Sequence, residues 1–157
     1  MADPTLGPEL SLLQKHVGDW DAAITVVPSP GAAPQASTGR LTGRLICGGR
    51  WLVTDFKNHT TGFEGRGIYG YNPATKRYVG TWVDDMRTNL YVGEGDWDDA
   101  ARTLTYHGTA ALPNGQSLAW REATETISAT EQLFRVLFPQ PDGSDFEMMR
   151  AVYRKRP

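Results

Sequence analysis

Two short stretches of the sequence place acidic residues beside tryptophan in a way that could support binding or catalysis. In the first, Trp82–Arg87, an aromatic ring, two carboxylates and a guanidinium lie at the predicted end of a strand. Asp84 and Arg87 could anchor a ligand beside Trp82. Alternatively, their charges form an exposed local ion pair, and such pairs contribute little to stability.

The second stretch is an alternating strand in which Glu122 is a candidate general base. One face carries Trp120, Glu122, Thr124 and Thr126, and the other carries Arg121, Ala123, Glu125 and Ile127. Both faces are mixed, so the period of two does not decide which face points inward. Trp120 favours burial of the face with Glu122, and burial would raise the pKa of this carboxyl toward the range useful for proton transfer. An exposed or ion-paired Glu122 is the alternative.

Arg150 is a candidate for an interior charge in the last predicted strand. One face of that strand carries Phe146, Met148, Arg150 and Val152. We expect this face to be the packed one, and a buried arginine requires a carboxylate partner. Arg150 is therefore predicted to pair with Asp84 or Glu122.

The remaining reactive residue types favour neither a metal nor a cofactor. His16, His59 and His107 do not fall in a metal-ligand spacing, and no histidine that could hold a haem lies in the last third of the chain. Gly65–Gly70 fits Gly-x-Gly-x-x-Gly, but no helix is predicted after it, so it is not expected to bind a dinucleotide. Cys47 follows an apolar run, and we expect a buried structural cysteine. We expect no metal site and no cofactor.

Length and composition favour one soluble domain spanning residues 1–157. A chain of 157 residues can bury a core without disulfides, and its net charge of −2 argues against nucleic-acid or anionic-membrane partners. The start, Met1–Pro4, lacks the pattern of a signal peptide, and no apolar run approaches the length of a membrane span. A cytoplasmic location is expected.

The elements that must position these residues are one helix and about ten short strands. Leu10, Leu13 and Val17 share one face of a predicted helix over about 8–17, with Pro8 in its first turn. Period-two segments separated by turn residues follow; they span 20–26, 38–47, 50–59, 63–71, 76–84, 88–96, 103–112, 116–128, 133–138 and 146–155. Because closure removes the edges of a long meander, the fold class is predicted to be all-β, an antiparallel up-and-down barrel over about 18–156.

Three segments resemble a known family. They are His16–Trp20 after the helix, Gly48–Leu52, and Gly65–Asp84, which contains Gly-Tyr-x-Pro-x-x-x-x-Tyr-x-Gly-x-Trp-x-Asp. The spacing resembles a widespread bacterial family of single-domain proteins of unknown function with a lipocalin-like (calycin) barrel. The resemblance implies the fold and assigns no activity, since such folds host many functions.

We interpret the chain as a binder of a small amphipathic or aromatic molecule held inside the barrel. In the strand that ends at Asp84, the face with Tyr78, Gly80 and Trp82 is predicted to line the interior and its mouth. The predicted ligand-binding residues are Trp82, Tyr69, Tyr71, Trp120, Trp51 and Arg150. One alternative is a cofactor-free isomerase, cyclase or hydrolase that uses Asp84, Glu122 and Arg87. Another is an interaction protein without a ligand, assembled as a homodimer through a barrel face.

Overall fold

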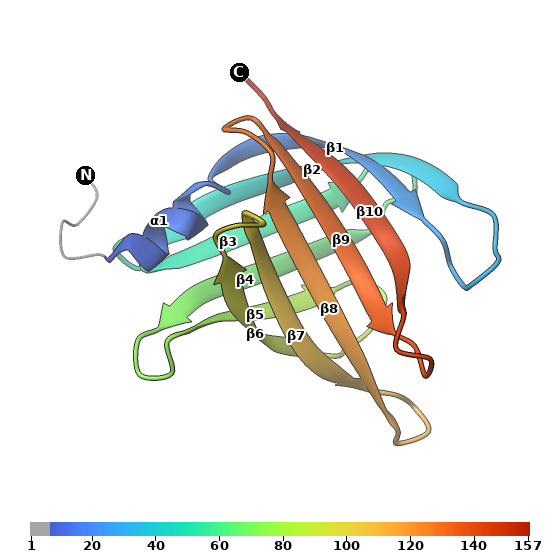
Figure 1. Ribbon diagram of the computed structural model, residues 1–157. Helices are drawn as coiled ribbons and strands as arrows, with labels where there is room; N and C mark the ends of the chain where they lie inside the picture. The colour runs from blue at the N-terminus through green and yellow to red at the C-terminus, as the bar shows by residue number, and fades with distance from the viewer. Residues whose placement is uncertain (1–6) are drawn as a thin grey trace.

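The computed structural model describes residues 7–157, which form one short helix and a closed antiparallel barrel (Figure 1). The start of the chain, on which the signal-peptide expectation rests, lies outside these residues. The elements are α1 (Pro8–Gln14), β1 (Gly18–Val26), β2 (Gln35–Ile46), β3 (Trp51–Asn58), β4 (Glu64–Asn72), β5 (Arg77–Asp84), β6 (Tyr91–Asp98), β7 (Thr103–Ala111), β8 (Ser117–Thr126), β9 (Glu131–Pro139) and β10 (Asp145–Lys155). The predicted fold class is confirmed.

Each strand pairs with its neighbours in sequence, and β1 closes the barrel against β10. The closing seam places Trp20 opposite Lys155 and Val26 opposite Met149. Side chains alternate between the two faces of a strand, and directly paired residues share a face. One alternate set on every strand therefore fills the interior. Among the described residues, no helix has the length and apolar character needed to cross a membrane.

The helix α1 lies at one end of the barrel, where Leu13 is buried against interior residues of β3, β5 and β7 (Figure 1). Pro8 begins it, as predicted, but it ends at Gln14 rather than near residue 17. Side chains of the barrel donate hydrogen bonds to the carbonyl oxygens that follow the helix. Gln132 Nε2 donates to the carbonyl oxygen of Lys15 at 3.3 Å, and Trp20 Nε1 donates to that of His16 at 3.1 Å.

The same junction contains a half-buried histidine, His16. His16 Nδ1 and Gln132 Oε1 are 2.9 Å apart, so the ring donates to the amide oxygen. Burial lowers the pKa of His16, and Lys15 acts in the same direction, while the bond to Gln132 opposes them. His16 is therefore held neutral, and it joins the helix end to β9 across the barrel.

The interior contains two separate apolar clusters. The first contains Leu13, Leu52 and Tyr106 near the helix, and the second contains Trp20, Phe56 and Tyr153 from β1, β3 and β10. A barrel of this width is usually filled by side chains or holds one small ligand. The charge of Glu122 acts on Tyr106 of the first cluster and on Tyr153 of the second, so this polar residue lies between them.

One predicted environment and one predicted strand boundary are wrong. Cys47 is exposed, because it belongs to the turn between β2 and β3, where its φ is 53°. Trp97 belongs to β6 rather than to the following turn, because β6 runs from Tyr91 to Asp98 instead of 88–96. The inward side chain of Trp97 packs against the first cluster.

Candidate functional site

The interior of the barrel holds the carboxyl group of Glu122 between the two apolar clusters. Glu122 is paired in register with Tyr106 on β7 and with Val136 on β9, and Tyr106 is buried, so Glu122 points inward. Its negative charge acts on Tyr106 of the first cluster, on Tyr153 of the second, and on Tyr69 of β4. These three phenols belong to three different strands of the wall, β7, β10 and β4.

Burial raises the pKa of Glu122 to about 7. The cause is desolvation, which penalises the charged form of a carboxyl enclosed by protein. Within residues 7–157, the Glu122 side chain forms no ion pair and no hydrogen bond. The side chain is nevertheless only half-buried, as are Phe134 and Val136 beside it. The carboxyl is thus enclosed by the barrel without being packed on all sides.

Two further polar groups near Glu122 lack partners. The hydroxyl of Tyr106 and Nε1 of Trp120 are buried, and neither has a hydrogen-bond partner among residues 7–157. Their residues are 7% and 8% exposed. Burial and the Glu122 charge raise the pKa of Tyr106, so its hydroxyl keeps its proton at neutral pH. Tyr106 can therefore donate or accept a hydrogen bond, and Trp120 can only donate.

Glycines on the inner faces of neighbouring strands make room for these rings. A Cβ on Gly80 would lie 2.8 Å from the ring of Tyr69, and one on Gly95 would lie 2.8 Å from that of Tyr106. Likewise, a Cβ on Gly108 would lie 2.6 Å from the indole of Trp120. Such distances are shorter than carbon atoms in contact allow. The glycine-rich strands therefore position the aromatic side chains around Glu122.

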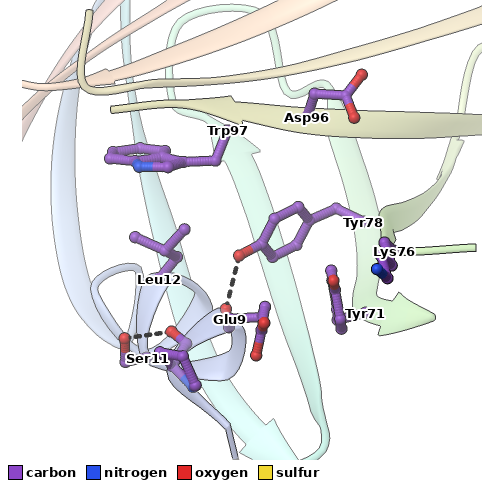
Figure 2. A pocket seen from close by; sticks show the side chains of 9 residues that line it. Glu9, Ser11, Leu12, Tyr71, Lys76, Tyr78, Asp96 and Trp97 are labelled. Carbon is purple, nitrogen blue, oxygen red and sulfur yellow. Dashed lines mark hydrogen bonds between the residues drawn. The ribbon is translucent and has the colours of Figure 1, made fainter. Parts of the chain in front are cut away.

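A surface cleft of about 470 Å³ lies beside α1, at the end of the barrel where the helix packs (Figure 2). Its walls include Leu12, Tyr71, Tyr78 and Trp97, and Glu122 is not among its lining residues. Tyr78 donates a hydrogen bond of 2.9 Å to the carbonyl oxygen of Glu9, which fastens the helix to β5. Burial, with smaller contributions from Glu9 and Tyr71, raises the pKa of Tyr78 to about 12.

Tyr78 also links the cleft to the interior. It lies opposite Gly95, which in turn lies opposite Tyr106, so all three residues share the inner face. The electrostatic influence of Tyr78 reaches Tyr106, and Tyr106 is paired with Glu122. The phenol groups of Tyr78 and Tyr106 therefore lead from the cleft toward the Glu122 carboxyl.

Asp84 and Arg87 do not join this group. The carboxylate of Asp84 accepts hydrogen bonds of 3.1 Å from Trp82 Nε1 and from the amide of Met86. Trp82 is half-buried and packs against the second cluster. Arg87 is exposed and forms no ion pair with any residue from 7 to 157. Neither charge contributes to the pKa of Glu122.

The structure corrects the predicted environments of Arg150 and Trp51. Arg150 is half-exposed on the outer face and pairs with Glu147 at 3.1 Å, because a bulge between Glu147 and Met149 reverses the alternation in β10. The bulge turns Ala151 and Tyr153 inward instead. Trp51 lies on the outer face of β3, where its ring covers Gly70.

No set of three His, Cys, Asp or Glu side chains within residues 7–157 is arranged to hold a metal ion. His107 lies on the outer face, with its Nε2 3.7 Å from the carboxylate of Asp96. The groups around Glu122 that have no hydrogen-bond partner among residues 7–157 are its own carboxyl, the Tyr106 hydroxyl and the indole N–H of Trp120.

The sequence of residues 5–155 matches the model of DUF1579, described as a protein family of unknown function. The chain belongs to this family. A comparison with curated proteins found no match to this DUF1579 member.

Among solved structures, the DUF1579 chain resembles Rv2717c from M. tuberculosis, with a TM-score of 0.61 and 13% identity over 97% of this chain and 99% of that one. It also aligns with a redesigned β-barrel, with a TM-score of 0.40 and 12% identity over 93% of this chain and 96% of that one. The first likeness shows the fold alone.

Proposed function

We propose that the barrel interior binds a small amphipathic or aromatic molecule beside Glu122. The observation that carries the proposal is that two buried polar groups, the Tyr106 hydroxyl and Trp120 Nε1, have no hydrogen-bond partner among residues 7–157. They lie beside the half-buried carboxyl of Glu122, which forms no ion pair or hydrogen bond within the same residues. Buried polar groups in folded proteins nearly always have hydrogen-bond partners. A ligand with polar atoms at one end would satisfy these groups together.

The surroundings indicate the rest of the ligand. The rings of Tyr69 and Tyr106 lie 5.5 Å apart, and those of Tyr91 and Trp120 lie 6.4 Å apart, so aromatic faces border the polar groups. An apolar or aromatic body would pack against them, as in other small-molecule sites. The cleft beside the helix, with Tyr78 in its wall, is the proposed approach. Holding one small ligand in this way is a property of lipocalin-like barrels.

The five tryptophans allow a direct test by nuclear magnetic resonance. Titration with styrene glycol, a neutral aromatic diol, is expected to shift the indole N–H signal of Trp120, because that group gains an acceptor. Trp120→Phe should weaken binding about fivefold, the value of one hydrogen bond near 1 kcal/mol.

Trp51 is the matched control, since its indole lies on the outer face. Its N–H signal should not move, and Trp51→Phe should bind the diol like the wild type. A shift confined to Trp51, or no shift of Trp120 at any diol concentration, would exclude binding in the interior.

A second candidate function is proton-transfer catalysis by Glu122. A carboxyl whose pKa is raised to about 7 is suited to take up and release a proton near neutral pH. Tyr106, paired with it across the strands, could stabilise a developing oxyanion by donating its hydroxyl proton as a hydrogen bond. Asp84 and Arg87 have no part in this reaction, because neither acts on Glu122.

Catalysis predicts that the protein accelerates exchange of the benzylic hydrogens of phenylacetone for deuterium in heavy water. Glu122→Gln should reduce the acceleration at least about a hundredfold, as expected when a general base is lost. The exchange is measured by mass spectrometry, with Glu125→Gln on the outer face of the same strand as control. Equal rates with and without protein would favour binding alone.

A further inference from the structure

Glu122 faces the interior without a positive side chain against it. The arginines on the strands around it are directed outward, where Arg121 pairs with Asp145 and Arg135 pairs with Glu125. Arg150 of β10 is likewise directed to the outer face by the bulge. A carboxylate removed from water is costly unless a cation accompanies it. The protein therefore supplies the carboxylate and leaves the countercharge to be supplied from elsewhere.

The groups that face Glu122 are aromatic and uncharged. They are Tyr106 of β7, Tyr69 of β4 and Tyr153 of β10, and the side chain opposite on β9 is the apolar Val136. Burial and the Glu122 charge raise the pKa of all three phenols, so none becomes an anion near neutral pH. The faces of such rings attract organic cations, and the attraction grows when water is excluded.

We infer that the ligand of the barrel is an organic amine whose protonated nitrogen pairs with the Glu122 carboxylate among the rings of Tyr69, Tyr106 and Tyr153. This inference rests on the proposed binding function and specifies its ligand class. The ammonium group donates to Glu122 and to the hydroxyl oxygen of Tyr106. Trp120 Nε1 donates to an oxygen elsewhere on the ligand, so an amine that also carries a hydroxyl or carbonyl group would bond to Glu122, Tyr106 and Trp120 together.

Three probes with one skeleton test the inference: phenylethanolamine is a cation, styrene glycol is neutral, and mandelate is an anion. At about pH 8 we expect the amine to bind at least about tenfold more tightly than the diol, and mandelate more weakly than both. Affinities are measured by isothermal titration calorimetry on the full chain. Glu122→Gln should abolish the advantage of the amine over the diol, whereas Glu125→Gln should preserve it.

The pH dependence provides a second readout that needs no variant. Only the carboxylate form of Glu122 attracts the ammonium, so the affinity for the amine should rise about tenfold between about pH 6 and about pH 8, while that for the diol stays level. A diol that binds as tightly as the amine, or an amine advantage that survives Glu122→Gln, would refute the amine while leaving interior binding intact. Binding of none of the three probes would refute both.

Discussion

Glu122→Gln is expected to make the protein more stable at about pH 8, by about 3 kcal/mol in the free energy of unfolding. The pKa of Glu122 is about 7 in the folded state and 4.5 in the unfolded state. Between these values the folded state binds more protons, so stability falls as pH rises from about 4.5 to about 7 and stays reduced above that. The difference between these two pKa values corresponds to about 3 kcal/mol of stability.

Glutamine resembles the protonated acid, so the variant and the wild type should differ little at about pH 4. Urea unfolding over a series of pH values measures the difference, and Glu125→Gln provides the matched control on the outer face of the same strand. Parallel curves of stability against pH for Glu122→Gln and the wild type would show that Glu122 is not held in its protonated form by burial.

Gly43→Ala is expected to destabilise the fold by about 3 kcal/mol or more. A Cβ at this buried position of β2 would overlap the carbonyl oxygen of His16. That oxygen accepts the hydrogen bond from Trp20 Nε1, and Trp20 is fully buried, so the backbone of His16 cannot move aside without losing the bond and the packing of the indole. The end of α1 must therefore separate from the barrel.

Chemical unfolding gives the size of the effect, and hydrogen exchange of the Trp20 indole N–H shows whether the helix junction opens. Arg44→Ala, at the next position on the exposed face, should leave both unchanged within about 0.5 kcal/mol. A loss below about 1 kcal/mol for Gly43→Ala would mean that the helix end can shift freely.

The alternation of residue types was enough to predict the barrel and the inner face of β5. Tyr78 and Gly80 are buried, and Trp82 and Asp84 are half-buried, on the face that the sequence predicted to line the interior. In β8 both faces are mixed, and only the size of Trp120 indicated which side points inward. The structure places Trp120 and Glu122 on the inner face, and the role of Glu122 stays a proposal.

Alternation failed where the backbone departs from a regular strand. The extra residue at the bulge of β10 reverses the two faces, so the sequence pattern directed Arg150 inward and Tyr153 outward. No single residue type marks this bulge in the sequence. Trp51 was misplaced for another reason: an aromatic residue can cover a glycine on the outer surface, and Gly70 gives it that space.

The tyrosines around Glu122 were missed because the sequence pattern does not show which inner faces meet. Tyr106 and Tyr153 were not among the predicted site residues, and pairing of β7 with β8, of β8 with β9 and of β9 with β10 brings them toward the carboxyl. One local signal was present. Gly93 and Gly95 alternate on the strand before Tyr106, and such a pair of glycines indicates that large side chains from other strands lie over it, here Trp120 of β8 and Tyr106 of β7.

The seam between β1 and β10 is the one contact between strands that no hairpin provides. Every other pair of strands can form as soon as its second member leaves the ribosome, but this pair joins segments more than a hundred residues apart, from Trp20 to Lys155. Contacts of such long range form slowly. A nascent chain that has not yet produced β10 carries two open sheet edges, on β1 and β9, and is exposed to aggregation until its last strand arrives.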